Sequence, residues 1–233
     1  LIKFSKMPTA IKKNGVRATI GKCTGISENK VSIGIVHSLF KLNHEFDEVL
    51  EEISRSENNI EYILFDTPIR QGLASRIKDR WVKTSPSTLS KSKFLEWIPY
   101  EQFIQFLSQL DLMLDPFYYG AGTVFFQCMG CGLPMVSMPT RYRKTRAAVS
   151  GYAQMGINKP PIANNKTEYI KICRELIRSK NLRNDLRNEI LQKSDKLHDA
   201  ETCCKEHESF VRNAVTKSRK EMEGGGGRSA III

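Results

Sequence analysis

The sequence has 233 residues and a mass of 26.6 kDa; 40% of the residues are hydrophobic, 26% are charged, and the net charge is +11. This composition is typical of a soluble globular chain that buries a core without disulfides, and it excludes a disordered or fibrous protein. The longest apolar runs fall far short of the ~20 residues of a membrane-spanning helix and no secretory signal opens the chain, so we expect a cytoplasmic protein without membrane contact.

Three segments are expected along the chain. Residues 1–30 are basic, carry Pro8 and Gly15, and show no sustained periodicity, which is typical of an interdomain linker or the tail of a preceding domain. The chain does not begin with Met, and we expect it to be part of a longer protein. Residues 31–218 are expected to form one domain. Residues 219–233 include four consecutive glycines, which favours a disordered tail.

Short apolar runs alternate with helical patterns from residue 31 onward. Apolar residues recur at i, i+3, i+4 and i+7 from Phe46 to Ile53, which predicts a helix. Further helices are predicted around 74–81, 103–110 and 123–129, between strands at 31–36, 60–65, 94–98, 112–114 and 134–138. This alternation predicts an α/β fold, a Rossmann-like parallel sheet with helices on both faces. From Ala147 the pattern becomes helical, and Cys203, Phe210, Val211 and Val215 favour a closing C-terminal helix.

The positive charge is concentrated in two stretches. Residues 1–30 carry +6 and residues 140–193 carry +9, whereas 31–139 carry −4 and 194–233 are neutral. Such a division favours binding of phosphates or an acidic surface at defined places. An absent acidic partner domain, or solubility alone, would explain it equally well. Binding to nucleic acid is not expected, because the aromatic residues fall mainly at buried periods.

The six cysteines do not form a disulfide framework. Their spacing is irregular, and a chain of this length needs no covalent staples. Cys128 and Cys131 form a Cys-x-x-Cys pair, but no second pair stands at zinc-site spacing. We therefore interpret the cysteines as small buried apolar residues and expect no metal site.

Two loops at predicted strand ends could bind phosphate. Gly120, Ala121, Gly122 and Thr123 lead from a strand into a helix, where backbone N–H groups and the helix dipole attract anions. The motif is neither a dinucleotide fingerprint nor a P-loop, and an N-capping threonine after a glycine turn explains it as well. Lys41 follows the first strand and could reach a diphosphate as a point charge, although a solvated surface lysine is the commoner interpretation.

A basic loop follows the fifth predicted strand, with Arg141, Arg143, Lys144 and Arg146 expected at the same edge of the sheet. Catalytic motifs are otherwise missing from the sequence: the four histidines do not cluster, and no Gly-x-Ser-x-Gly or His-Glu-x-x-His occurs. These residues alone do not identify a reaction that the protein catalyses.

Taken together, however, several segments resemble the C-terminal half of the O-linked N-acetylglucosamine transferase family, including its bacterial TPR-linked and Spindly-type members. The similarity covers roughly residues 31–215. Its most specific part joins Gly120-Ala121-Gly122-Thr123 to Gly132-Leu133-Pro134-Met135-Val136-Ser137-Met138-Pro139, and it is supported by Ser38-Leu39-Phe40-Lys41-Leu42, Leu110-Asp111-Leu112-Met113-Leu114-Asp115-Pro116-Phe117 and Tyr152-Ala153-Gln154-Met155-Gly156-Ile157.

The resemblance implies a GT-B fold, in which this chain is the C-terminal, nucleotide-sugar-binding domain. It implies that Lys41 meets the donor diphosphate and that Gly120 to Thr123 cradle the phosphates. Gln127 stands where the family usually has an acidic residue for the nucleotide ribose. Ser38, Phe103 and Arg141 are further donor-side candidates; Ser38 and Phe103, with Tyr100 and Phe106, depart from the family's usual residues.

The resemblance also implies an activity: inverting, metal-independent transfer of a sugar from a nucleotide sugar, UDP-N-acetylglucosamine above all, to Ser/Thr hydroxyls of proteins, without a cofactor. The catalytic residues, the N-terminal GT-B domain and the TPR repeats would lie outside this chain, which alone is expected to bind donor weakly and to transfer nothing. Two alternatives remain at this point. One is a GT-B transferase with a glycan or small-molecule acceptor, and the other is a degenerate, non-catalytic binding module.

Overall fold

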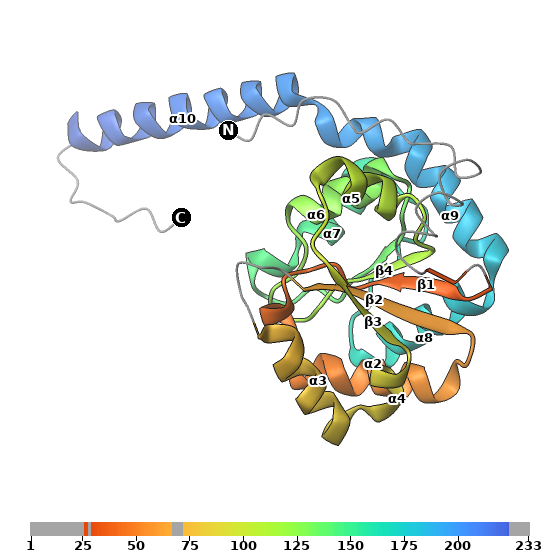
Figure 1. The fold of residues 1–233 in the computed structure, drawn as a ribbon. Coiled ribbons are helices and arrows are strands. Elements are labelled where there is room, and N and C mark those ends of the chain that lie inside the picture. The colour runs from red at the N-terminus through yellow and green to blue at the C-terminus, as the bar shows by residue number, and fades with distance from the viewer. Residues whose placement is uncertain (1–25, 28, 67–71, 224–233) are drawn as a thin grey trace. The chain divides into compact units, whose positions relative to one another are not determined.

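The computed structural model describes residues 26, 27, 29–66 and 72–223, and divides the chain into two units, residues 1–197 and 198–233. The first unit is built around a five-stranded parallel sheet with the strand order β3-β2-β1-β4-β5 (Figure 1). The strands are β1 (Val31–Gly34), β2 (Ile60–Asp66), β3 (Ser92–Glu96), β4 (Leu112–Leu114) and β5 (Met135–Val136). The predicted α/β class and parallel sheet are confirmed.

Helices cover both faces of this sheet, as predicted (Figure 1). On one face, α2 contacts α3, α4 and α8; on the other, α5 contacts α6, while α9 contacts both α6 and α8. The helices of this unit are η1 (Leu39–Lys41), α2 (His44–Ser56), α3 (Leu73–Thr84), α4 (Pro86–Ser90), α5 (Tyr100–Leu107), α6 (Thr123–Gly130), η3 (Arg143–Thr145), α7 (Ala147–Met155), α8 (Lys166–Arg178) and α9 (Lys180–Lys193), before η4 (Ser194–His198).

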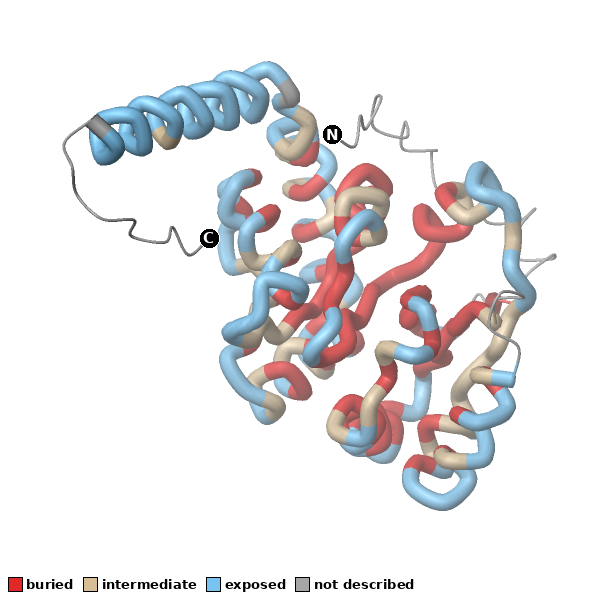
Figure 2. Tube along the Cα trace, turned by 90° about the vertical axis from the view of Figure 1, so that its left-hand side faces the viewer, coloured by how far each residue is buried: buried red, intermediate tan, exposed pale blue. Residues whose placement is uncertain are grey.

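Helix α2 illustrates how the sequence sets these elements. Its N-cap Asn43 accepts a hydrogen bond from the N–H of Phe46, which satisfies one of the free donors of the first turn. Phe46, Val49, Leu50 and Ile53 are all buried, as the sequence pattern predicts. Figure 2 shows the same division along the unit, with buried residues in the sheet and outward helix faces exposed.

Three predicted strands differ from the observed ones by two residues at one end or both, and β2 is longer than predicted by one residue. The first ends at Gly34 instead of residue 36, and the fifth is reduced to Met135–Val136. The third spans Ser92–Glu96 instead of 94–98, so that Trp97, 59% exposed, lies in the loop after it. After β1 the apolar run continues past the hydrogen-bonded ladder, because Ile35 and Val36 are buried although they lie beyond the strand.

The domain begins before residue 31. The side chain of Ile26 is buried in the core, and Ser27 donates to Glu61 of β2 from its backbone N–H (2.8 Å) and its hydroxyl (2.9 Å). Residues 1–25 and Glu28, which make up the greater part of the linker predicted at 1–30, lie outside the described residues.

The second unit contains α10 (Ala200–Glu223). The predicted helix around Cys203 and Val215 is confirmed, and Phe210, Val211 and Val215 are exposed on it. Residues 219–223 belong to α10, so the helix extends five residues beyond the predicted domain end at 218, and the rest of the predicted tail lies outside the described residues.

The cysteines follow the predicted pattern in part. Cys128, Cys131 and Cys173 are buried free thiols, whereas Cys203 and Cys204 are exposed, and Cys23 lies outside the described residues. Within the described ranges, no three His, Cys, Asp or Glu side chains gather in a way that could hold a metal ion. No helix in that part of the chain is long and apolar enough to cross a membrane.

Candidate functional site

The strand order has a switch point between β1 and β4. The chain winds outward from β1 to β2 and β3 in one direction and to β4 and β5 in the other. In parallel α/β sheets, ligands bind beyond the carboxyl ends of the strands at such a point, because the loops there part and leave a crevice. In this structure, two loops lie at the switch point: the loop after β1, which includes η1, and the loop from Asp115 to Gly122 after β4.

The two loops are tied together by Lys41. Its Nζ donates to the carbonyl oxygen of Gly120 at 3.0 Å and lies 4.3 Å from the centre of the Tyr119 ring. The ring of Tyr119 packs edge-on against Phe40, with 6.1 Å between ring centres. Asn43 adds a further tie, donating to the carbonyl of Phe117 at 3.2 Å. Lys41 and the glycine loop therefore lie together at this edge of the sheet.

Lys41 keeps capacity for a ligand. An ammonium has three donors, and the bond to Gly120 uses one of them. Partial burial lowers the pKa of Lys41, while the nearby carboxylate of Asp115 raises it. A half-buried cation at a crevice interacts with an anion more strongly than a fully solvated lysine does, because less water screens it.

The carboxylate of Asp115 fixes the conformation of the glycine loop. Its Oδ1 accepts from the N–H of Ala121 at 2.6 Å, and its Oδ2 accepts from the hydroxyl of Ser137 at 2.7 Å. A Cβ on Gly120 would stand 2.8 Å from the same Oδ2, closer than real Cβ contacts allow. The carboxylate therefore requires glycine at position 120 and anchors the loop to the end of β5.

The loop amides have different roles. The N–H of Gly120 donates to the carbonyl of Lys144 (3.1 Å) and that of Ala121 to Asp115, so both hold the loop together. Gly122 is the N-cap of α6, and Thr123 and Val124 begin its first turn, where N–H groups have no intrahelical acceptors. An anion at this place would therefore meet the N–H donors at the start of α6, where the helix dipole also attracts it.

The loop after β5 brings two further cations to this place. A hollow of about 430 Å³ is lined by Tyr119, Gly120, Ala121, Gly122, Arg143, Lys144 and Ala147. Arg143 and Lys144 thus lie beside the glycine loop, and Nζ of Lys144 lies 5.3 Å from the centre of the Tyr119 ring. The other candidate of this loop, Arg141, instead donates to the hydroxyl of its neighbour Tyr142 at 3.0 Å.

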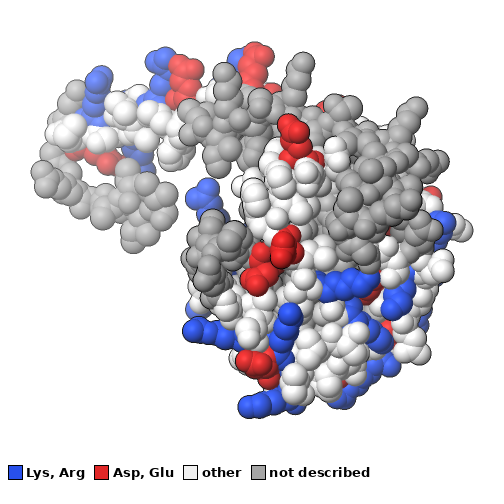
Figure 3. Space-filling model, in the orientation of Figure 1, with Lys and Arg blue, Asp and Glu red and all other residues white. Residues whose placement is uncertain are grey.

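Thr123 and Gln127 are one turn apart on α6 and so share a face of that helix. Thr123 is exposed and Gln127 is half-buried. Neither lines the hollow around Gly120. On the face drawn in Figure 3, and among the residues that the structure describes, lysine and arginine side chains are interspersed with acidic ones instead of forming one patch.

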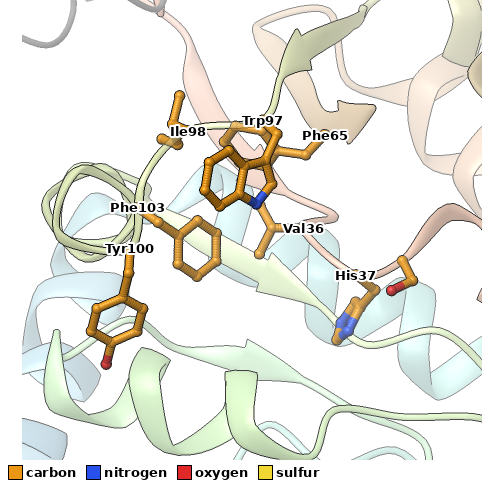
Figure 4. Close-up of a pocket in the computed structure, with 8 residues that line it drawn as sticks. Val36, His37, Phe65, Trp97, Ile98, Tyr100 and Phe103 are labelled. Atoms are coloured by element: carbon orange, nitrogen blue, oxygen red, sulfur yellow. The ribbon is translucent and has the colours of Figure 1, made fainter. Parts of the chain in front are cut away.

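A second, mostly aromatic pocket of about 210 Å³ opens beside the first loop (Figure 4). Its lining consists of Val36, His37, Ser38, Phe65, Trp97, Ile98, Tyr100 and Phe103. Figure 4 shows Trp97 and Phe103 pointing toward Val36. The predicted donor-side residues Ser38 and Phe103 therefore lie in one pocket. Phe106 does not line it, because its ring is buried in the core against Phe65, with 5.1 Å between ring centres.

His37 and Asp115 form a buried pair beneath the site. Nε2 of His37 lies 3.6 Å from Oδ1 of Asp115. Burial, assisted by the charge of Lys41, lowers the pKa of His37 to about 3. Burial raises the pKa of Asp115 to about 6, against the hydrogen bonds from Ser137 and Ala121 and the charge of Lys41. Sequence reasoning assigned no role to either residue, although both follow directly on predicted strands.

These two shifts predict opposite effects of pH on stability. In the unfolded chain the histidine binds a proton below about pH 6.5, whereas His37 of the native chain does so only near pH 3. Between these values the unfolded state therefore binds more protons, so the contribution of His37 to the free energy of unfolding increases as the pH rises. Native Asp115 keeps its proton up to about pH 6, whereas unfolded aspartate loses it near pH 4, so this group subtracts stability as the pH rises from about 4 to 6.

We expect the variants His37→Gln and Asp115→Asn to separate the two contributions in urea unfolding between pH 4.5 and 5.5. The free energy of unfolding of the natural chain minus that of His37→Gln should rise with pH, by up to about 1.4 kcal/mol per pH unit. The same difference for Asp115→Asn should fall. The exposed His207→Gln is the control, and differences of the same sign for both variants would contradict the assignment.

Comparison with known proteins identifies the fold. No family model matches the chain, and no curated protein matches it significantly. Among solved structures, a mutant of the O-GlcNAc transferase of Thermobaculum terrenum matches with a TM-score of 0.69 and 17% identity over 80% of this chain and 36% of that chain. The fold is that of a GT-B glycosyltransferase domain.

Other solved structures of this fold agree. HepE of Anabaena, in complex with UDP-glucose, matches with a TM-score of 0.60 and 14% identity over 86% of this chain and 53% of that chain. The sucrose-phosphate synthase of Thermosynechococcus elongatus matches with a TM-score of 0.60 and 14% identity over 91% of this chain and 52% of that chain. The GT-B domain thus spans about a third to a half of the proteins it matches, and at these identities the likeness is one of fold.

Proposed function

We propose that this GT-B domain binds the diphosphate of a nucleotide sugar at the switch point and forms the donor half of a glycosyltransferase. The observation that carries the proposal is the contact of Lys41 with Gly120, which sets an ammonium beside the N-terminus of α6. Arg143 and Lys144 line the same hollow. Cations and free N–H donors at one place suit a diphosphate.

The same groups suit the chemistry of glycosyl transfer. When the bond between the anomeric carbon and the phosphate oxygen breaks, its electron pair and negative charge stay on the departing diphosphate. The negative charge on the diphosphate grows as this bond lengthens. Lys41 and the first-turn amides of α6 would therefore stabilise the transition state more than the intact bound donor. A group on the acceptor side would remove the proton of the attacking hydroxyl.

The aromatic pocket beside Ser38 would take the nucleobase. Trp97 and Phe103 offer ring faces for stacking, which contributes about 1–3 kcal/mol per base and favours no particular base. Base selection would then rest on backbone groups and on Ser38. This proposal extends the donor site from the Gly120 loop across the carboxyl edge of the sheet to β3.

For the transferred group we propose N-acetylglucosamine, with Ser/Thr hydroxyls of proteins as acceptors. Two observations support this: the resemblance of the sequence to the O-linked N-acetylglucosamine transferase family, and the TM-score of 0.69 with one bacterial O-GlcNAc transferase. The neighbour that binds UDP-glucose, HepE, has a lower TM-score of 0.60.

Calorimetric titration of the 233-residue chain with UDP-N-acetylglucosamine, UDP-glucose and GDP-fucose tests the proposal. We expect the UDP sugars to bind and UDP-N-acetylglucosamine to bind most tightly. Binding of UDP-glucose or GDP-fucose in preference would contradict the proposed sugar while keeping the donor site. Absence of binding by all three at millimolar concentration would contradict the donor site itself.

A further inference from the structure

The ring of Tyr119 contacts two cations of the candidate diphosphate site. Its centre lies 4.3 Å from Nζ of Lys41, which belongs to η1 after β1, and 5.3 Å from Nζ of Lys144, which belongs to η3 after β5. Both distances fall within the about 6 Å over which the face of an aromatic ring attracts an ammonium group. One side chain of the loop after β4 thus joins cations from the loops after β1 and β5.

The two ammonium groups are held close together although their charges repel. Because both lie near one ring centre, their Nζ atoms are within about 10 Å of each other, which is also about the Debye length at 0.1 M salt. In the part of the chain that the structure describes, no carboxylate lies within ion-pair distance of either Nζ atom, and Asp115 acts on Lys41 from farther away. The negative face of the Tyr119 ring therefore offsets a repulsion that no ion pair removes.

A strained turn in the backbone sets the ring at this place. The N–H of Tyr119 donates to the carbonyl of Phe117 at 2.9 Å, and Tyr118 between them has a φ of 67°. A three-residue turn with a positive φ at its centre is the rare form of the γ-turn, and such strain is concentrated at functional sites. The hydroxyl of Tyr118 donates to Glu45 of α2 at 2.6 Å. The ring of Tyr119 packs edge-on against Phe40, with 6.1 Å between ring centres, so contacts at both residues hold the turn.

The ring leaves the two cations open to a ligand. Tyr119 is 45% exposed, and it lines the hollow beside Gly120 together with Lys144. The bond to the Gly120 carbonyl uses one of the three N–H donors of Lys41. The ammonium of Lys144 donates no hydrogen bond to any of the described residues. The ring thus fixes where the ammonium groups lie without occupying the donors that an anion would use.

We propose that Tyr119 is a positioning residue of the donor site, whose ring holds the ammonium groups of Lys41 and Lys144 in place before the diphosphate of a nucleotide sugar binds. The inference rests on the proposed function, because it takes the bound anion to be a diphosphate. Fixing two long side chains in advance lowers the conformational entropy that binding costs. A diphosphate offers oxygens on two linked phosphates, so it meets an ammonium group from each loop and removes their mutual repulsion.

Calorimetric titration with UDP of variants at position 119 tests the positioning. Tyr119→Leu should weaken UDP binding about 3- to 10-fold, because the two lysines lose the ring that holds them. Tyr119→Phe should bind UDP as the natural chain does, since phenylalanine keeps the aromatic face. Unchanged binding in Tyr119→Leu would overturn the proposal. Equal weakening in Tyr119→Phe would also overturn it, because the loss would then belong to the hydroxyl.

Tyr142→Leu is the matched control. Tyr142 is likewise 45% exposed, and its ring centre lies 5.8 Å from Nζ of Lys144, near the limit of such an attraction. The cation nearer to this ring is Arg141, at 5.0 Å, which does not line the hollow. We expect UDP binding within about twofold of the natural chain. A loss equal to that of Tyr119→Leu would show a general effect of removing an aromatic side chain and would overturn the proposal.

The side chain of Lys41 gives a readout that a purely structural role of the ring would not move. In the chain without ligand, the ring current of Tyr119 should shift the ε-methylene protons of Lys41 upfield of those of an exposed lysine such as Lys171. The shift should be kept in Tyr119→Phe and lost in Tyr119→Leu. An ordinary chemical shift for Lys41 in the natural chain would overturn the proposal.

The titrations separate a failure of this proposal from a failure of the donor site. Absence of UDP binding by the natural chain would contradict the proposed function and the positioning role together. UDP binding that Tyr119→Leu leaves unchanged would contradict the positioning role alone.

Discussion

Replacement of Lys41 by alanine is expected to weaken the binding of UDP about 10- to 100-fold, because one charge-assisted hydrogen bond contributes about 1.5–3 kcal/mol. The change also removes the contact between Nζ of Lys41 and the Gly120 carbonyl, which joins the two loops of the site. The measurement is calorimetric titration of the variant with UDP.

The matched control is Lys171→Ala. Lys171 lies on α8, is exposed, and pairs with Glu175 at 4.0 Å, so its loss removes the same formal charge without touching the site. We expect unchanged UDP binding in this control. Equal weakening by the two changes would reduce the role of Lys41 to general electrostatic attraction and would contradict the site described here.

Replacement of Gly151 by alanine is expected to lower the free energy of unfolding by about 1–3 kcal/mol. Helix propensity alone predicts a gain of about 0.8–1 kcal/mol at this position of α7. However, the added Cβ would overlap Cε1 and Cζ of the Phe125 ring. That ring is fully buried and packs edge-on against Phe126 and Tyr152, with ring centres 5.6 and 5.5 Å apart, so it has no room to move.

Urea unfolding of Gly151→Ala beside the control Ser150→Ala measures this effect. Ser150 is exposed on the same helix, so its change to alanine should be neutral or slightly stabilising. The double variant Gly151→Ala/Phe125→Leu should recover part of the loss by making room for the methyl group. An increase in stability for Gly151→Ala would show that α6 and α7 pack less closely than described.

Local sequence patterns predict the fold class well, for a physical reason. The spacing of Phe46, Val49, Leu50 and Ile53 identifies α2 and the face it buries, since a helix places these positions on one side. Lys41 and the Gly120 loop could likewise be brought to one edge from sequence, because the carboxyl ends of parallel strands share an edge.

The fine structure of the site could not be predicted in this way. The N–H group of Gly120 donates to the carbonyl of Lys144, and that of Ala121 donates to Asp115. These hydrogen bonds depend on contacts between loops, which a local sequence pattern does not reveal. The same holds for Gly151, whose need for glycine arises from a ring on another helix. Tyr118 adopts a φ of 67°, unusual for a residue with a side chain, and its hydroxyl donates to Glu45 at 2.6 Å.

The exposure of α10 was also beyond the sequence pattern. Periodicity identifies an apolar stripe and predicts that something covers it, but it does not say what. The same apolar pattern fits a helix that closes its own domain and one that pairs with another chain.

The most direct test of the donor site is a ¹⁵N-resolved NMR titration of the chain with UDP. The account predicts that the amides of Gly122, Thr123 and Val124, at the start of α6, shift most strongly. Those of Gly120 and Ala121, already hydrogen-bonded within the protein, should shift less. Shifts confined to elements away from this loop, or no shifts at millimolar UDP, would contradict a diphosphate site at the switch point.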